Sequence, residues 1–301
     1  MLSYRKHFSP VFIWKTSLFH RVSILFVMDH FIHYLKRRIG GENKGASRQN
    51  ISNDRHFYAA APQRFNAAFH RPEFHVTRQS GGPARSVTAG STIWIFSVIE
   101  SPWGKLGPAL DAKIVVSSVR KQDDGLTRFY ASDSSAWFPL QDASGLLASL
   151  ESVDEKGSVA PVWPNRSKPP GLYLQSLRRL HRAERLEEWS DKLTGGDINF
   201  ISYRIKDGTQ QAFRHARKLF DESAIVYWDR FCLPRRLVER RENVSGNALN
   251  ETLMLFVGRS SKVWGIETPL YTEPGCYAQK EAARAKALNK YVPVCVPVTG
   301  H

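Results

Sequence analysis

Glu281 and Tyr277 are the residues whose types and spacing point most directly to chemistry. They lie four positions apart in a stretch with a helical pattern, residues 274–288, so both side chains face one side of the expected helix. A carboxylate can stabilise the oxocarbenium-like cation that develops when a glycosidic bond breaks. Taken alone, a Glu that follows Lys280 is usually a solvated charge. The role of Glu281 therefore depends on the helices and strands around it.

Apolar runs alternate with helical patterns through the last third of the chain. The pattern predicts strands at 198–203, 224–228, 262–266 and 292–296, with helices at 209–221, 246–257 and 274–288 between them. Such alternation is typical of a parallel sheet that is covered by helices on both faces. Ligands bind beyond the carboxyl ends of the strands in these sheets, so we expect the site within residues 202–207, 229–242 and 267–281.

Three motifs in this segment occur in a recognisable order. INFISYR begins at Ile198, YWDRFCLPRR follows the second strand, and ETPLYTEPGCYAQKEAARA leads into the helix of Glu281. Together they resemble the TIR (Toll/interleukin receptor/resistance) domain, over about 196–301. The resemblance implies an α/β, flavodoxin-like parallel sheet, here shortened because the sequence ends at His301, just past the fourth strand.

Enzymatic members of the TIR family cleave the nicotinamide ribosyl bond of NAD+, so the resemblance implies an NAD+ nucleosidase. Glu281 matches the family's catalytic glutamate. The residues matched to the nucleotide pocket are Ser202, Tyr203, Arg204 and Tyr277, the last at the position of the family's Trp. We further expect Trp228 or Tyr277 to stack on the nicotinamide and Arg204 to pair with a pyrophosphate oxygen. NAD+ is then a substrate, and neither a resident cofactor nor a metal is expected.

A second interpretation of the same segment is a TIR module that binds proteins and has no enzyme activity. A loop after Pro234 interleaves four arginines with two glutamates, which is typical of a solvated ion-pair run. In the family the corresponding loop mediates contacts between domains, so the resemblance implies a homo-oligomer in signalling or defence. These six loop residues are Arg235, Arg236, Glu239, Arg240, Arg241 and Glu242.

The preceding residues divide by composition. Residues 1–90 hold 14 Lys and Arg against 4 Asp and Glu, and so carry most of the net charge of +15. We interpret them as a basic, largely irregular extension; the alternative is an arm that binds nucleic acid or an anionic membrane. Short β-branched and aromatic runs at 92–99, 112–119 and 127–131 predict a small β-rich domain over 91–160. Residues 161–195 read as a Pro-rich linker followed by an amphipathic helix over 172–193.

The hydrophobic content of 42% and the charged content of 24% exclude wholesale disorder. Cys232, Cys276 and Cys295 are too few and too irregularly spaced for a disulfide framework, so we expect a reducing compartment, the cytoplasm. Residues 11–35 are apolar but interrupted by charges, which leaves no clean membrane span. Met28 is an alternative start, in which case residues 1–27 are not translated.

Overall fold

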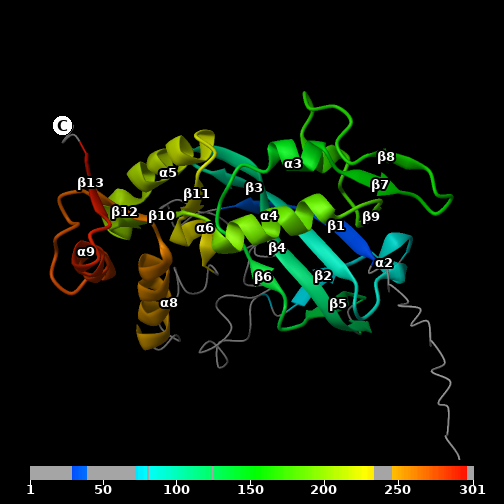
Figure 1. Cartoon of the computed structure of the whole chain (residues 1–301), viewed down its shortest axis with the longest axis horizontal. Helices are drawn as coiled ribbons and strands as arrows, with labels where there is room; N and C mark the ends of the chain where they lie inside the picture. Colours follow the sequence, from blue (N-terminus) through cyan, green and yellow to red (C-terminus); the bar gives the residue numbers. More distant parts are fainter. Residues whose placement is uncertain are drawn as a thin grey trace, which may run out of the picture.

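The structure, a computed structural model, describes residues 29–38, 72, 74–79, 81–121, 123, 125–233 and 246–296. It is a mixed α/β fold with two β-sheets, a large mixed sheet from the N-terminal part and an all-parallel sheet from the C-terminal part. In Figure 1 the parallel sheet and its helices occupy one end of the molecule and the large sheet occupies the rest. Within the described ranges, no helix has the length and apolarity needed to cross a membrane.

The large sheet has nine strands in the order β2-β5-β4-β3-β1-β9-β7-β8, with β6 attached to β4. Its longest members, β3 (Thr92–Ser101) and β4 (Gly104–Lys121), form an antiparallel hairpin. The other strands are β1 (His30–Arg38), β2 (Phe74–Thr77), β5 (Thr127–Ala131), β6 (Ala136–Trp137), β7 (Glu151–Val153), β8 (Val159–Pro161) and β9 (Arg178–Leu180). Two short helices, α2 (Pro83–Ser86) and α3 (Ser144–Ala148), accompany them.

The expectation that residues 1–90 are largely irregular is wrong for β1. This strand lies inside the sheet, parallel to β3 and antiparallel to β9. Phe31 and Ile32 point to opposite faces, and both are fully buried. A strand that is covered on both faces lacks the apolar and polar alternation of a half-buried strand, which is why its pattern went unrecognised.

The helix expected over 172–193 is also shorter than predicted. The structure has a 3-10 helix, η4 (Pro170–Leu172), then β9, and only then helix α4 (Glu184–Gly195). The leucines that suggested one helical face belong to different cores: Leu174 and Leu180 join the main core, whereas Leu177 joins a second one with residues of β1, β3, β4 and β5. Their regular spacing was therefore not a helical period.

The C-terminal parallel sheet confirms the predicted fold. Its strands are β10 (Ile198–Tyr203), β11 (Ile225–Tyr227), β12 (Lys262–Glu267) and β13 (Tyr291–Cys295), and all neighbouring pairs are parallel. The order β11-β10-β12-β13 is that of the first four strands of a flavodoxin-like sheet. Between the strands lie α5 (Ile205–Asp221), α6 (Asp229–Cys232), α8 (Gly246–Arg259) and α9 (Tyr277–Ala287).

The two sheets share one hydrophobic core. Residues of β3 and β4 and residues of α5, β10 and β11 belong to the same buried cluster. Leu140 forms an isolated antiparallel bridge with Val226 of β11, so the backbones of the two parts are hydrogen-bonded directly. Trp103, in the β3–β4 turn, packs on Phe213 of α5 with ring centroids 5.8 Å apart. The β-rich part is therefore packed against the parallel sheet.

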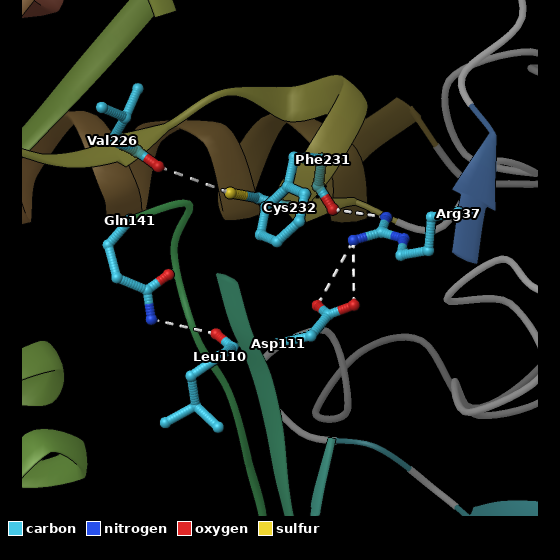
Figure 2. A network of polar contacts seen from close by, with 7 residues as sticks. All are labelled: Arg37, Leu110, Asp111, Gln141, Val226, Phe231 and Cys232. Carbon is cyan, nitrogen blue, oxygen red and sulfur yellow. Dashed lines mark hydrogen bonds and ion pairs between the residues drawn. The ribbon is translucent and has the colours of Figure 1, made fainter. Parts of the chain in front are cut away.

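A buried arginine ties the two parts together as well. Arg37 of β1 donates to both carboxylate oxygens of Asp111 on β4, at 3.3 and 3.1 Å, and to the backbone carbonyl of Phe231 in α6 at 2.8 Å (Figure 2). Its guanidinium also lies over the Phe231 ring, 4.4 Å from the centroid. Arg37 thus links the centre of the large sheet to helix α6, which follows β11.

Candidate functional site

A cavity of about 250 Å³ lies where β10 and β11 end. Tyr203 is the last residue of β10, Arg204 follows it, and Asp229 begins α6, separated from β11 by Trp228 alone. Helices α8 and α9 close the other sides of the cavity. The described residues that line it are Tyr203, Arg204, Ile205, Asp229, Leu233, Leu249, Leu253, Pro274, Gly275, Cys276, Tyr277, Ala278 and Glu281. The cavity therefore occupies the carboxyl edge of the parallel sheet, where the topology favours ligand binding.

Glu281 lies at the buried side of this cavity. Glu281 is 5% exposed, and its Oε2 accepts a hydrogen bond of 2.6 Å from the hydroxyl of Ser202 on β10. The Ser202 oxygen also lies 3.0 Å from the hydroxyl of Tyr271. The α9 residues around Glu281 on the buried face, Ala278, Ala282 and Ala285, are small, so the helix packs close enough to the sheet for this contact.

Burial raises the pKa of the Glu281 carboxyl to about 8. The hydrogen bond from Ser202 acts in the opposite direction because it favours the ionised form, and the negative charge of Asp229 adds to the increase. The carboxyl is therefore mostly neutral at pH 7 without a ligand. A cation in the cavity would favour its ionised form.

Tyr203 and Asp229 form a second polar pair in the cavity. The Tyr203 hydroxyl donates to Oδ1 of Asp229 at 2.6 Å, and the backbone N–H of Arg230 donates to the same oxygen at 2.7 Å. Burial raises the pKa of Tyr203 well above its ordinary value, so its hydroxyl stays a donor. These two donors fix the orientation of the Asp229 carboxylate at the start of α6.

An ion pair lies at the mouth of the cavity. Arg204 donates to Glu273 at 2.5 Å, and the two side chains are 24% and 39% exposed. Tyr277, at the start of α9, lines the cavity with its ring half-buried, and the Lys280 ammonium lies 5.7 Å from that ring's centroid. The mouth thus offers a guanidinium and an aromatic ring to a ligand.

The structure brings most of the predicted site residues together. Glu281, Tyr203, Arg204 and Tyr277 line one cavity. Ser202 is fully buried beneath it and contacts Glu281 instead of the cavity. The expected role of Ser202 in lining the pocket is therefore replaced by a role in holding the carboxyl group.

Trp228 is a correction to the prediction. Its side chain is fully buried and packs edge-on against Phe213 of α5, with ring centroids 5.8 Å apart. It is not among the residues that line the cavity. Trp228 lies between the end of β11 and the start of α6, so the sequence pattern did not reveal that it faces the core. Of the two rings expected to stack on the nicotinamide, Tyr277 lines the cavity.

Other residues of the site were not singled out from the sequence. Asp229 lay within the predicted ligand-binding edge, and its position directly after a strand was the available signal. Tyr271 and Glu273 lie in an irregular loop after β12, where no periodicity identifies them. The arginine-rich loop expected to mediate assembly, from Arg235 to Glu242, lies outside the described residues.

The polar groups that line the cavity are thus two carboxyls, a guanidinium and two phenols. Among the residues that the structure describes, no three His, Cys, Asp or Glu side chains are grouped as metal ligands. A carboxyl whose pKa lies near neutrality suits a ligand that carries positive charge or develops it during reaction. The arginine at the mouth suits a phosphate or another anion.

Comparisons of the chain with family models, with curated proteins and with solved structures gave no significant match. The function is therefore inferred from the cavity and from the resemblance in sequence.

Proposed function

We propose that this chain is a TIR-type NAD+ glycohydrolase that cleaves the nicotinamide ribosyl bond in the cavity beneath α9. The observation that carries the proposal is the burial of Glu281 against Ser202, at the wall of a cavity that Tyr203, Arg204 and Tyr277 also line. Five residues matched from separate sequence motifs thus meet at one edge of the sheet. A solvated surface glutamate, the ordinary interpretation, would lie outside such a cavity.

The chemistry required is modest. Cleavage breaks the C1′–N bond, and its electron pair neutralises the pyridinium nitrogen of the leaving nicotinamide, so no acid is needed. The ribose becomes oxocarbenium-like, and a carboxylate next to it lowers the barrier. Glu281 is the residue we assign to this role.

The raised pKa of Glu281 is compatible with the proposal. A cation about 4 Å from a carboxylate is worth about 4 kcal/mol at an effective dielectric constant near 20. That energy corresponds to a decrease of about three units in the carboxyl pKa. A bound nicotinamide ring, which is cationic, would therefore bring Glu281 into its ionised form at neutral pH.

The size and polarity of the cavity favour one orientation of NAD+. A volume of about 250 Å³ is too small for the whole dinucleotide, so we assign the buried space to the nicotinamide ribose. Tyr277 then lies where it can stack on the nicotinamide ring. Arg204, at the mouth, is the residue we assign to the pyrophosphate.

Self-association in signalling or defence is part of the proposal and comes from the resemblance. We infer a cytoplasmic setting from the cysteines, since the buried Cys232 and Cys276 and the exposed Cys295 form no disulfide. Binding of nucleic acid or an anionic membrane by the N-terminal arm remains an alternative proposal, and most of that arm lies outside the described residues.

The test is to incubate the concentrated wild-type chain with NAD+ and to measure free nicotinamide by chromatography. We expect nicotinamide and ADP-ribose, or a cyclised form of it, in equal amounts. A chain that self-associates yet releases no nicotinamide at any concentration would instead be a non-enzymatic interaction module.

A further inference from the structure

A row of hydrogen-bonded side chains connects Glu281 to a second carboxyl group, that of Glu267 at the end of β12. Ser202 donates to Oε2 of Glu281 at 2.6 Å, and its oxygen lies 3.0 Å from the hydroxyl of Tyr271. Tyr271 forms a hydrogen bond with Tyr291 of β13, and the Tyr291 hydroxyl donates to Oε1 of Glu267 at 2.8 Å. These three hydroxyls, which we call the hydroxyl row, link two carboxyl groups on different elements.

The neighbouring strands leave room for Tyr291 to reach across the sheet. Gly265 of β12 is the register partner of Ser202 on β10. A Cβ added at Gly265 would clash with the hydroxyl of Tyr291, so the tyrosine occupies the space that a side chain would otherwise fill. Tyr271 and Tyr291 also pack in one apolar cluster with Ala282 of α9. The hydroxyl row therefore lies beneath the helix that carries Glu281.

The hydroxyl row has fewer protons than contacts. Ser202, Tyr271 and Tyr291 supply three hydroxyl protons to four contacts, counting those with the two carboxyls. Burial raises the pKa of Tyr271 to about 12 and also raises the pKa of Tyr291, so both phenols keep their protons. With both carboxyls ionised, Ser202 and Tyr291 donate outward, and Tyr271 has one proton for two neighbours. A proton on either carboxyl completes all four hydrogen bonds.

Glu281 lies at the buried end of the row. Burial and the negative charge of Asp229 both favour its neutral form. The other titratable or charged side chains that line the cavity are Tyr203, Arg204, Cys276 and Tyr277. Glu273 holds Arg204, and α8 contributes two leucines to the cavity wall. A proton shared by the two ends of the row therefore resides on Glu281 until a cation enters the cavity.

Glu267 lies at the more exposed end of the row. Its side chain is half-exposed, as is that of Tyr291. The Lys286 ammonium of α9 lies 4.7 Å from the centroid of the Tyr291 ring, and the register partner of Glu267 on β13 is Cys295. A half-exposed carboxyl can exchange protons with water, whereas a ligand in the cavity would separate Glu281 from water. The row therefore offers a proton a second route out of the site.

We propose that Glu267 controls the ionisation of Glu281 through the hydroxyl row. When a cation enters the cavity, Glu281 gives its proton to Ser202, and Ser202 and the two tyrosines each pass their own proton one step further. Glu267 accepts the last proton and later releases it to water. Only O–H bonds form and break, and all three hydroxyls then donate toward Glu281. The coupling itself requires no particular cation, but its use in catalysis rests on the proposed NAD+ glycohydrolase function.

The first experiment measures the ionisation of Glu281 without NAD+, by carbon-13 NMR of protein labelled at the glutamate carboxyls. Glu281→Gln assigns the signal. We expect Tyr291→Phe to lower the titration midpoint by about one pH unit, because Ser202 and Tyr271 then have a proton for each of their remaining contacts. Tyr130→Phe, which removes a phenol from β5 in the large sheet, should keep the wild-type midpoint. An unchanged or higher midpoint in Y291F would overturn the proposal.

A second variant, Glu267→Gln, tests whether Glu267 acts through the row. Glutamine cannot take up the proton, and its amide can donate to Tyr291, so the Glu281 midpoint should again fall by about one pH unit. In a Tyr291→Phe background, E267Q should cause no further change, because the row is already broken. Glu251→Gln, at an exposed position of α8, is the control for loss of a charge. Equal shifts from E267Q in both backgrounds would overturn the role of the row.

Kinetics with NAD+ separate this inference from the proposed function. Y291F should raise kcat/KM at pH 6 by up to about tenfold, since more of Glu281 is then ionised. A merely structural role for Tyr291 would lower the activity instead, and that result would overturn the use of the row in catalysis. A wild-type chain that cleaves no NAD+ would contradict the proposed function and leave the NMR result standing. An unshifted Glu281 titration would overturn the coupling and leave the proposed function standing.

Discussion

Glu281 combines two properties, burial in the protein and access to a cavity. It is almost fully buried, and it nevertheless lines a cavity that opens at the edge of a sheet. Burial alone would make it a neutral, inert group. The cavity gives it access to a ligand, and a cationic ligand would restore its charge. The function of Glu281 therefore depends on the ligand that enters the cavity.

The pH dependence of catalysis should report the Glu281 carboxyl. Its pKa in the free protein is raised to about 8, and in the proposed reaction the ionised form is the active one. We expect kcat/KM for NAD+ to rise about tenfold per pH unit below pH 8 and to level off above it. Ser202→Ala should move this limb to higher pH, because it removes the hydrogen bond that favours the carboxylate. A kcat/KM that is flat between pH 5 and 9 would be incompatible with the assignment.

The ion pair at the mouth should compete with the substrate. Glu273 holds Arg204 at 2.5 Å, and a bound pyrophosphate would need the same guanidinium. Glu273→Gln should therefore lower KM for NAD+ by about twofold to fivefold, the usual worth of a partly exposed pair, with little change in kcat. Arg204→Gln should raise KM. The assignment of Arg204 fails if steady-state kinetics give both variants the wild-type KM.

At the scale of elements, the sequence predicted the C-terminal sheet well. Each strand of that sheet is a short apolar run bounded by a helix. The alternation of apolar runs with helical patterns therefore predicted β10, β12 and their connecting helices. The edge where the site lies followed from the rule for parallel sheets. The direction of Trp228 did not follow, because this residue lies between β11 and α6, where neither the strand period nor the helix period applies. Local pattern predicts an element more readily than the direction of one side chain.

Gly196, which connects α4 to β10, is closely surrounded by other atoms of the protein. A Cβ added at Gly196 would lie 2.5 Å from the Lys192 carbonyl oxygen and 2.7 Å from Cδ1 of Ile225. Gly196→Ala should therefore destabilise the protein by about 1–3 kcal/mol, as overpacking does. Gly195→Ala is the matched control, since its Cβ would meet no atom within 4 Å. Denaturant unfolding curves measure both variants, and equal midpoints would contradict the packing argument.

At the scale of the whole molecule, the site is built on a sheet that shares its core with the larger one. Arg37 is the clearest link, because it binds Asp111 and also Phe231, two residues after Asp229 (Figure 2). From the sequence Arg37 belonged to a basic arm. No local pattern could indicate that its partner lies 74 residues further along the chain. Long-range pairings of this kind are what the sequence left unpredicted.

Removing the buried Arg37–Asp111 pair should lower the free energy of unfolding more than removing an ion pair at the surface. The Asp111 side chain is 2% exposed, and Arg37→Met would remove its ion pair with the Arg37 guanidinium, which should lower the free energy of unfolding by about 3–5 kcal/mol. The double variant with Asp111→Leu should recover much of that loss. Lys36→Met, which removes an exposed pair with Glu100, should cost about 1 kcal/mol or less. Unfolding free energies test the order, and R37M no less stable than K36M would contradict it.

The central claim is that Glu281 cleaves NAD+, and Glu281→Gln tests it most directly. Glutamine keeps the size of the side chain and can still accept the hydrogen bond from Ser202, but it cannot stabilise a cation by charge. We expect release of nicotinamide from NAD+ to fall by about 100-fold to 1,000-fold, while Glu222→Gln, at an exposed position after α5, retains the wild-type rate. A folded E281Q variant that releases nicotinamide at the wild-type rate would contradict the claim.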